Sequence, residues 1–199
     1  MRIEKKLSEV ASEILVSDLL LYRGTGFLSG LIRIAGRSEY SHAAKVDRLV
    51  SDRDGTLVVY ETREWEGAGV SLLKIQVANH PGQIDLFRTN PDEVPGYSRN
   101  AARAYMRQFE GARYGYHAVW RAALDFLPVF RLFGKHNYTL ENGNQKAPFC
   151  SQLCSMADHK GGGIDPIPNL ANRITLPGDL AHSRFYRYMF TLVPEEVKA

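Results

Sequence analysis

Cysteine is scarce in this 199-residue chain, which contains only Cys150 and Cys154. Two cysteines four positions apart would lie on adjacent turns of one helix and point along it, a geometry that suits a disulfide poorly. A small secreted protein held together by disulfides is therefore excluded as a class. We expect both side chains to be reduced thiols, as in a reducing compartment.

Long apolar runs and blocks of like charge are also missing. Residues 1–7 contain no apolar stretch of signal-peptide length, and the longest early apolar run, residues 19–22, is too short to span a bilayer. The net charge is only +3 and the lysines and arginines are scattered, so nothing indicates a nucleic-acid surface. These absences predict a cytoplasmic protein that binds no nucleic acid and makes no membrane contact.

The composition is that of an ordinary globular protein, with 44% hydrophobic and 24% charged residues. No internal repeat, low-complexity tract or sharp boundary divides the chain, so we expect one α+β domain over residues 1–199. Periodicity and turn residues predict helices over residues 4–16, 27–35, 98–110 and 117–127, and one from about Cys150 to before Gly161. They predict strands over residues 19–24, 41–49, 56–61, 70–77 and 83–88. We expect a hairpin turn at residues 51–55, a strand pair joined at residues 80–82, and a last apolar segment over 186–192.

Cys150 is the candidate nucleophile because of its place in a helix. Pro148 precedes a helix-like run in which Cys150 falls in the first turn. The partial positive charge at the start of a helix stabilises a thiolate over a thiol and lowers the cysteine pKa. Cys154, one turn further on, is expected to pack in the core.

A cysteine nucleophile needs a base, and His42 is the candidate. It lies far upstream, in Tyr40-Ser41-His42, at the predicted start of a strand. An imidazole can hold a thiolate as an ion pair and later protonate the leaving group, while a third polar group orients the ring. Glu61, at the end of the neighbouring predicted strand, is the candidate for that third role. Taken singly, each member also has a structural interpretation: a hydrogen-bonding histidine, a small buried cysteine and a solvated glutamate.

Further residues could assist this site. An acyl-enzyme mechanism needs donors for an oxyanion, for which we expect the backbone N–H of Cys150 and, as a side-chain partner, Tyr22. Lys45 and Arg63 flank the proposed site and could meet a substrate carboxylate.

Two other interpretations concern residues outside the trio. Cys150, Cys154 and His159 could be zinc ligands, but they lack the paired spacing of a structural zinc site. The aromatic-rich stretch around His117 and His136 is expected to be core, with a substrate groove or an apolar contact surface as the alternative.

Short motifs spread over residues 18–180 carry a resemblance to a known family. In chain order they are Asp18-Leu19-Leu20-Leu21-Tyr22-Arg23-Gly24, Leu31-Ile32-Arg33, Tyr40-Ser41-His42, Glu61 with Gly69-Val70, Phe149-Cys150-Ser151-Gln152-Leu153, and Leu176-Pro177-Gly178-Asp179-Leu180. With them the chain resembles the circularly permuted papain-like thiol hydrolases of the NlpC/P60 superfamily, and within it the YiiX/YaeF-like group. The histidine precedes the cysteine here, the reverse of the papain order, as permutation would give. One departure is Ser17, where the group usually has glycine.

The resemblance implies a permuted papain-like fold, with an antiparallel sheet or small barrel packed against helices. It implies a triad of Cys150 as nucleophile, His42 as base and Glu61 as orienting residue. The implied activity is hydrolysis of a peptide, isopeptide, amino-acid amide or ester bond through an acyl-enzyme, with no metal and no cofactor. Residues 111–145, an expected aromatic-rich helical insertion, match nothing in the group, so the resemblance does not define the substrate.

Two alternatives to hydrolysis stay open. One is a thiol acyltransferase acting on lipid acyl groups, although such relatives usually carry an Asn-Cys-Glu context that differs from Phe149-Cys150-Ser151. The other is a non-catalytic binding module that retains the fold.

Overall fold

The computed structural model describes residues 2–24, 27–48, 56–63, 65–80, 82–90, 94–115 and 147–195, and the statements below concern these residues. The strands are β1 (Glu4–Lys6), β2 (Leu19–Tyr22), β3 (His42–Arg48), β4 (Leu57–Arg63), β5 (Gly67–Leu72), β6 (Ile84–Thr89) and β7 (Tyr186–Val193). The α-helices are α1 (Leu7–Val10), α2 (Phe27–Ala35), α3 (Leu73–Asn79), α4 (Arg99–Arg107), α7 (Cys150–Met156) and α8 (Pro177–His182). A π-helical turn (Ala157–Gly161) extends α7, and a 3-10 turn (Asn172–Ile174) follows.

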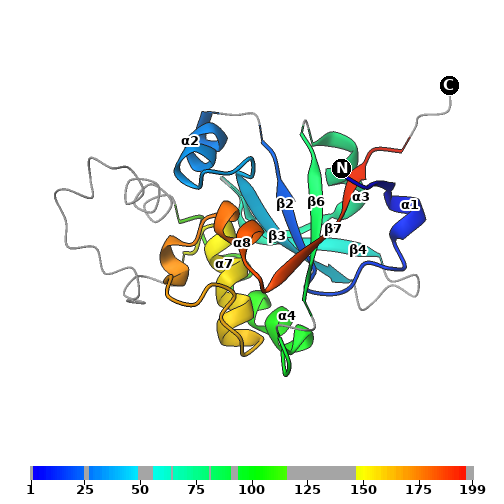
Figure 1. Ribbon diagram of the computed structural model, residues 1–199. Coiled ribbons are helices and arrows are strands. Elements are labelled where there is room, and N and C mark those ends of the chain that lie inside the picture. Colours follow the sequence, from blue (N-terminus) through cyan, green and yellow to red (C-terminus); the bar gives the residue numbers. More distant parts are fainter. Residues whose placement is uncertain are drawn as a thin grey trace.

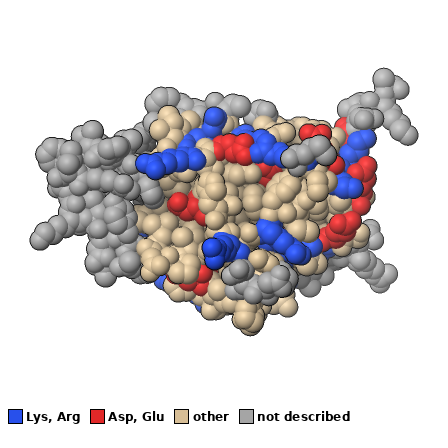
Figure 2. Space-filling view, viewed as in Figure 1, with Lys and Arg blue, Asp and Glu red and all other residues tan. Residues whose placement is uncertain are grey.

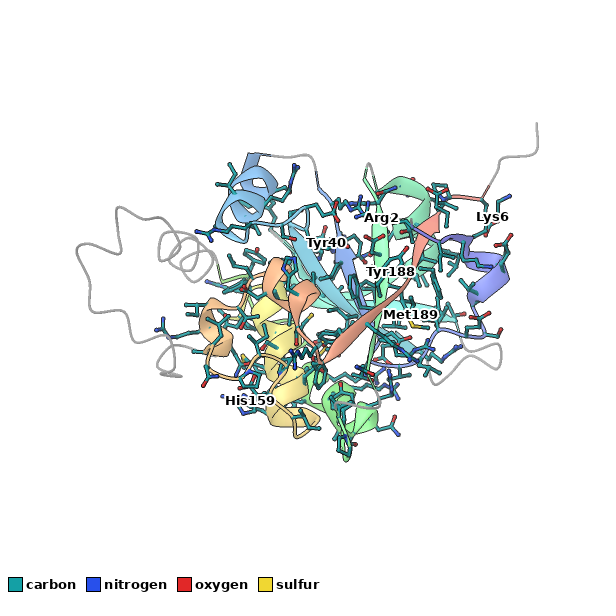
Figure 3. The ribbon with its side chains drawn as sticks, in the orientation of Figure 1. Arg2, Lys6, Tyr40, His159, Tyr188 and Met189 are labelled. Carbon is teal, nitrogen blue, oxygen red and sulfur yellow. The ribbon has the colours of Figure 1, made fainter. Side chains whose placement is uncertain are left out.

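The strands form one sheet in the order β1-β7-β6-β2-β3-β4-β5. All neighbouring strands are antiparallel except β1 and β7, which are parallel. Figure 3 shows the N-terminal residues Arg2 and Lys6 beside Tyr188 and Met189 of β7, and the Ile3 N–H donates to the Tyr188 hydroxyl at 3.2 Å. The described sheet is therefore mixed and open, with β1 and β5 at its edges, and the small-barrel alternative is wrong.

Helices cover both faces of this sheet. The central strand β2 is buried along its whole length, and its side chains alternate between two hydrophobic clusters. Leu19 and Leu21 face the cluster formed with α7, α4 and α8, whereas Leu20 and Tyr22 face the cluster formed with α1 and α3. Figure 1 shows α4, α7 and α8 on one side of the strands and α1 and α3 on the other.

Two predicted elements are wrong. Residues 4–16, expected as a helix, form β1 and the single turn α1, because this segment pairs with the edge of β7. Residues 70–77, expected as a strand, divide between the end of β5 and the helix α3. The expected pairing of this segment with residues 83–88 is wrong as well, since β6 lies between β2 and β7.

The other predicted helices and strands that fall on described residues are confirmed, with small shifts at their ends. Three predictions concern segments outside the described residues. They are the hairpin turn at 51–55, the helix at 117–127 and most of the insertion at 111–145.

The helix α4 is attached to the sheet by ion pairs. Arg99, Arg103 and Arg107 recur every four residues, so they lie on one face of the helix. Arg99 pairs with Asp18 at 2.8 Å, and both Arg103 (2.5 Å) and Arg107 (2.8 Å) pair with Asp47. Both carboxylates are buried. The helix is thereby held against the start of β2 and against β3.

The turn before Asp18 contains a residue with an unusual backbone conformation. Ser17 has φ of 64°, in the left-handed region that glycine enters without strain. Its Oγ donates to the Arg99 carbonyl at 2.9 Å. The side chain of Ser17 thus attaches this turn to the start of α4.

The surface is mixed in charge on the face seen in Figure 2, where basic and acidic side chains are interspersed. None of the described helices combines the length and the apolar character that a membrane crossing requires.

Candidate active site

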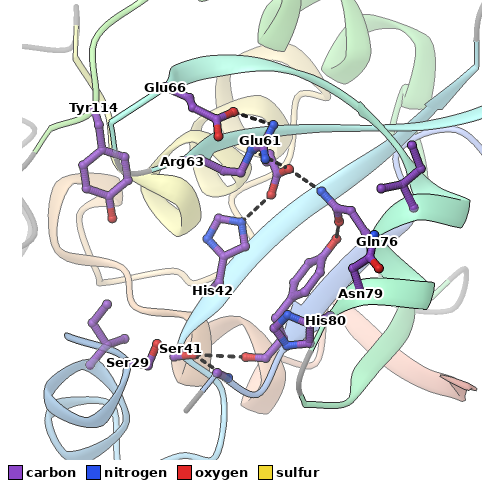
Figure 4. A pocket seen from close by; sticks show the side chains of 14 residues that line it. Ser29, Ser41, His42, Glu61, Arg63, Glu66, Gln76, Asn79, His80 and Tyr114 are labelled. Atoms are coloured by element: carbon purple, nitrogen blue, oxygen red, sulfur yellow. Dashed lines mark hydrogen bonds and ion pairs between the residues drawn. The ribbon is translucent and has the colours of Figure 1, made fainter. Parts of the chain in front are cut away.

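The three residues of the expected trio come together from three elements. Cys150 is the first residue of α7, His42 the first residue of β3, and Glu61 lies near the end of β4. The His42 Nε2 lies 2.7 Å from Glu61 Oε2 (Figure 4). The imidazole is 24% exposed, whereas the Glu61 side chain is 3% exposed. Because Nε2 faces the carboxylate, Nδ1 is the ring nitrogen left for the thiol.

The strands β3 and β4 position this site. Their register runs from Arg48–Leu57 to Lys45–Tyr60, whereas β4 continues to pair with β5 as far as Arg63–Gly67. Ala43 lies beyond the β3–β4 ladder, and its backbone N–H donates a hydrogen bond to the Cys150 sulfur instead. The start of α7 therefore meets the sheet where these two strands separate.

The thiol and the imidazole shift each other's pKa in opposite directions. Burial raises the pKa of Cys150, but the charge and hydrogen bond of His42, together with the backbone N–H groups of Ala43 and Ser151, lower it below its ordinary value. Burial lowers the pKa of His42, but Cys150 and then Glu61 raise it to about 10. Each group therefore favours the charged form of the other.

Cys154 behaves differently. It is fully buried in the core, and burial raises its pKa well above the ordinary value. As expected, it packs with the hydrophobic cluster, and both cysteines are free thiols. The pKa values of the two thiols therefore shift in opposite directions.

Glu61 is held by donors on both of its oxygens. Its Oε1 accepts hydrogen bonds from Ser71 Oγ at 2.9 Å and from Gln76 Nε2, and Arg63 Nε lies 3.2 Å away. Burial raises the pKa of Glu61, but the hydrogen bond and charge of His42, the Ser71 hydroxyl and the Arg63 guanidinium lower it overall. The carboxylate next to His42 is therefore ionised.

A cavity of about 520 Å³ opens beside this cluster. Its lining includes Tyr22, His42, Glu61, Arg63 and Tyr114, which Figure 4 shows from close by. Cys150 itself is 2% exposed. Polar and apolar groups share the wall of the cavity, as in many ligand pockets.

Two other residues expected at the site have different surroundings. Tyr22 lines the cavity, but its hydroxyl donates its proton to Gln76 Oε1. Lys45 is 1% exposed and pairs with Asp158 at 2.7 Å, with a second hydrogen bond to the Tyr186 hydroxyl at 2.9 Å. The structure therefore does not bring Lys45 to the cavity, because its ammonium is neutralised in the core.

Arg63 does line the cavity, as its flanking position suggested. Its guanidinium is 42% exposed and is shared between Glu61 and Glu66, the latter at 2.7 Å. Its charge is therefore already balanced by two carboxylates before any substrate binds.

Sequence reasoning missed Gln76 and Ser71. Both side chains donate hydrogen bonds to Glu61. The prediction of a strand over residues 70–77 gave no reason to expect these contacts. In the helix α3, Leu73, Gln76 and Val77 share one face, and both apolar residues are buried. A glutamine between two buried apolar positions of a helical face was the signal available.

The alternative in which Cys150, Cys154 and His159 bind zinc is not supported by the described residues. Among the described residues, no three His, Cys, Asp or Glu side chains form a group that could hold a metal ion. His159 instead lies 3.2 Å from Asn172 Nδ2 and 3.7 Å from Asp165.

Fold and site together define an α+β protein in which a buried cysteine, a histidine and a glutamate meet at the start of a helix. No protein-family model matches the chain, and no curated protein matches it. The fold resembles the crystal structure of the metalloprotein yiiX from Escherichia coli O157:H7, with a TM-score of 0.62 and 12% sequence identity over 91% of this chain and 99% of that one. At that identity the likeness concerns the fold alone.

Proposed function

We propose that this protein is a cysteine-dependent hydrolase of the NlpC/P60 superfamily that cleaves an amide or ester bond through an acyl-enzyme. The observation that carries the proposal is the pair of opposite pKa shifts at Cys150 and His42, with Glu61 Oε2 2.7 Å from His42 Nε2. Such a pair supplies a nucleophile and a general acid at neutral pH.

The first half of the proposed reaction forms the acyl-enzyme. The Cys150 thiolate attacks the substrate carbonyl carbon, and the carbonyl oxygen becomes an oxyanion. When this tetrahedral intermediate collapses, the bond to the amine or alcohol breaks and His42 gives that leaving group its proton. A thioester on Cys150 and a neutral imidazole remain.

The second half regenerates the enzyme. Neutral His42 takes a proton from water, whose oxygen attacks the thioester carbonyl. The carboxylic acid leaves, and the thiolate–imidazolium pair forms again. Glu61 stays ionised throughout and stabilises the imidazolium, as the acid member of such triads does.

The oxyanion needs a hydrogen-bond donor, which we assign to the backbone N–H of Cys150 at the start of α7. Tyr22 would be a second donor only if its hydroxyl left Gln76, to which it donates in this structure.

Labelling with iodoacetamide tests the proposal without a known substrate. We expect Cys150 to be alkylated quickly at neutral pH, with an apparent pKa well below the free value of about 8.5. Cys154→Ala should leave this rate unchanged, and Cys150→Ala should abolish it. Mass spectrometry identifies the labelled residue. Faster labelling of Cys154, or slow and equal labelling of both residues, would contradict the proposal and favour a binding module.

A further inference from the structure

The two oxygens of the Glu61 carboxylate have different partners. Oε2 faces His42, while Oε1 faces away from it, toward α3 and β5. On that side Gln76 Nε2 donates to Oε1 and also to Ser71 Oγ at 2.6 Å. Figure 4 shows the Gln76 side chain extending from α3 to the carboxylate. The orientation of Glu61 is thus determined from both sides.

The direction of these hydrogen bonds follows from the chemistry of the groups. An ionised carboxylate only accepts, so the amide nitrogen of Gln76 must face Glu61. Its amide oxygen then faces Tyr22, whose hydroxyl donates to it. Tyr22 is fixed in turn, because its ring packs edge-on against His42 and His80 with centroids 5.2 Å apart in each case. The hydrogen bonds are therefore donated in one direction: Tyr22 donates to Gln76, and Gln76 donates to Glu61.

We propose that Gln76 is a positioning residue, which with Tyr22 holds Glu61 turned toward His42 and so keeps Cys150 reactive. This inference rests on the proposed function. Gln76 does not touch the thiol, and it acts only through Glu61 and His42.

The other donors to Oε1 cannot replace Gln76. Ser71 Oγ itself accepts a hydrogen bond from Gln76, so its orientation depends on that residue. Arg63 is 42% exposed and is shared with Glu66, so solvent screens its contact with Glu61. Without the amide, Oε1 of the buried carboxylate keeps only a rotating hydroxyl and a screened cation as partners. Its hold on the His42 imidazolium weakens, and the thiolate loses part of its stabilisation.

Other titratable groups face the same cluster. They are Arg63 from β4, Glu66 from the turn before β5, His80 at the end of α3, Tyr22 from β2 and Cys154 from α7. Lys45 and Asp158 lie deeper and neutralise each other. A substitution of Gln76 by an uncharged residue of similar length leaves all of these charges in place. A change in the pH profile can therefore be assigned to the lost amide.

The test measures the alkylation rate of Cys150 by iodoacetamide from about pH 5 to pH 10. In Gln76→Met we expect the rate at neutral pH to fall about tenfold and the midpoint of the profile to move to higher pH. Tyr22→Phe keeps the ring and loses the hydroxyl, so it should shift the profile in the same direction by less. Val77→Ala is the matched control, because it loosens the buried face of α3 without a contact to Glu61.

Each outcome decides the inference. A shift in Gln76→Met that is absent from Val77→Ala supports it. A wild-type profile in Gln76→Met, or an equal shift in Val77→Ala, overturns it and leaves the proposed function intact. If the wild-type thiol itself reacts slowly, the proposed function fails and the inference fails with it. Should Gln76→Met not fold, as judged by circular dichroism, Tyr22→Phe decides by the same criterion.

Discussion

At the scale of single residues, Cys150 and His42 each shift the pKa of the other. Burial raises the pKa of Cys150, but His42 and two backbone N–H groups lower it overall. Burial lowers the pKa of His42, but Cys150 and then Glu61 raise it to about 10. Neither shift would occur alone, so the chemical unit is the pair.

His42 should therefore report the loss of its partner. In Cys150→Ala the thiolate is gone, so the pKa of His42 should fall from about 10 toward the ordinary value of 6.5, while Glu61 keeps it from falling further. An NMR titration of the ring protons measures this change. His159 contacts neither residue and serves as the internal control. An unchanged His42 titration would mean that the thiolate does not stabilise the imidazolium.

The three residues of the trio should differ in how much activity they leave. Cys150→Ala should abolish turnover, because no other group can form the acyl-enzyme, and His42→Ala should come close to it. Glu61→Gln should keep measurable activity, since an amide can still orient the ring but lacks the charge. Turnover of the folded variants on a substrate tests the order. Full activity in both Glu61→Gln and Glu61→Ala would remove Glu61 from the mechanism.

Part of this site could be predicted from the sequence. Cys150, His42 and Glu61 are residue types that can serve as nucleophile, base and orienting group. Local patterns in the sequence placed each of them at the start or end of a predicted helix or strand. Lys45 could not be placed, because its partner Asp158 lies on the π-helical turn after α7 and no local pattern relates the two. Gln76 and Ser71 were hidden because the side-chain period of their segment was taken as that of a strand.

At the scale of elements, α4 depends on charge as well as on apolar packing. Ala102 and Met106 are its buried residues, and its three arginines pair with Asp18 and Asp47. A buried carboxylate that is paired with cations is tolerated in a folded protein, whereas one that loses its cations strongly destabilises the fold. Removing the carboxylate also has a cost, because Asp47 is the common partner of Arg103 and Arg107.

Removing this partner should destabilise the protein. Asp47→Ala is expected to lower the free energy of unfolding by about 1–2 kcal/mol, because Arg103 and Arg107 lose their common carboxylate but stay partly exposed to solvent. Urea denaturation measures the change. Glu13→Ala, at an exposed position, should stay within about 0.5 kcal/mol of the wild type. An equally small change in Asp47→Ala would show that the ion pairs contribute nothing net.

The two elements that the sequence mispredicted fail for related reasons. The pattern of apolar residues in 4–16 fits a helix, but residues 4–6 gain backbone hydrogen bonds from β7, almost the whole length of the chain away. In residues 70–77 the β-branched residues favoured a strand, yet Leu73 and Val77 bury the same helical face against the sheet. In both cases a distant partner outweighs local propensity.

At the scale of the whole molecule, β7 joins the two ends of the chain. It lies between β1 and β6, so the last strand in sequence holds the first one in place. The Thr191 N–H donates to the Ile3 carbonyl at 2.8 Å across this junction.

Deleting residues 2–6 should expose one side of β7 and leave the site intact. We expect the Thr191 amide to exchange with solvent much faster, because its acceptor is gone. The Leu153 amide, which donates to Phe149 within α7, should keep its protection. Hydrogen exchange followed by NMR measures both. Unchanged protection of Thr191 would show that β1 does not shield the edge of β7.

The position of β7 also has a consequence for biosynthesis. A ribosome completes β6 with residue 89, but residues 186–193, which pair with its outer edge, are synthesised much later. During that interval the nascent chain presents an unpaired strand edge, which invites association with other growing chains. The sheet can therefore be completed only after residues 186–193 have left the exit tunnel.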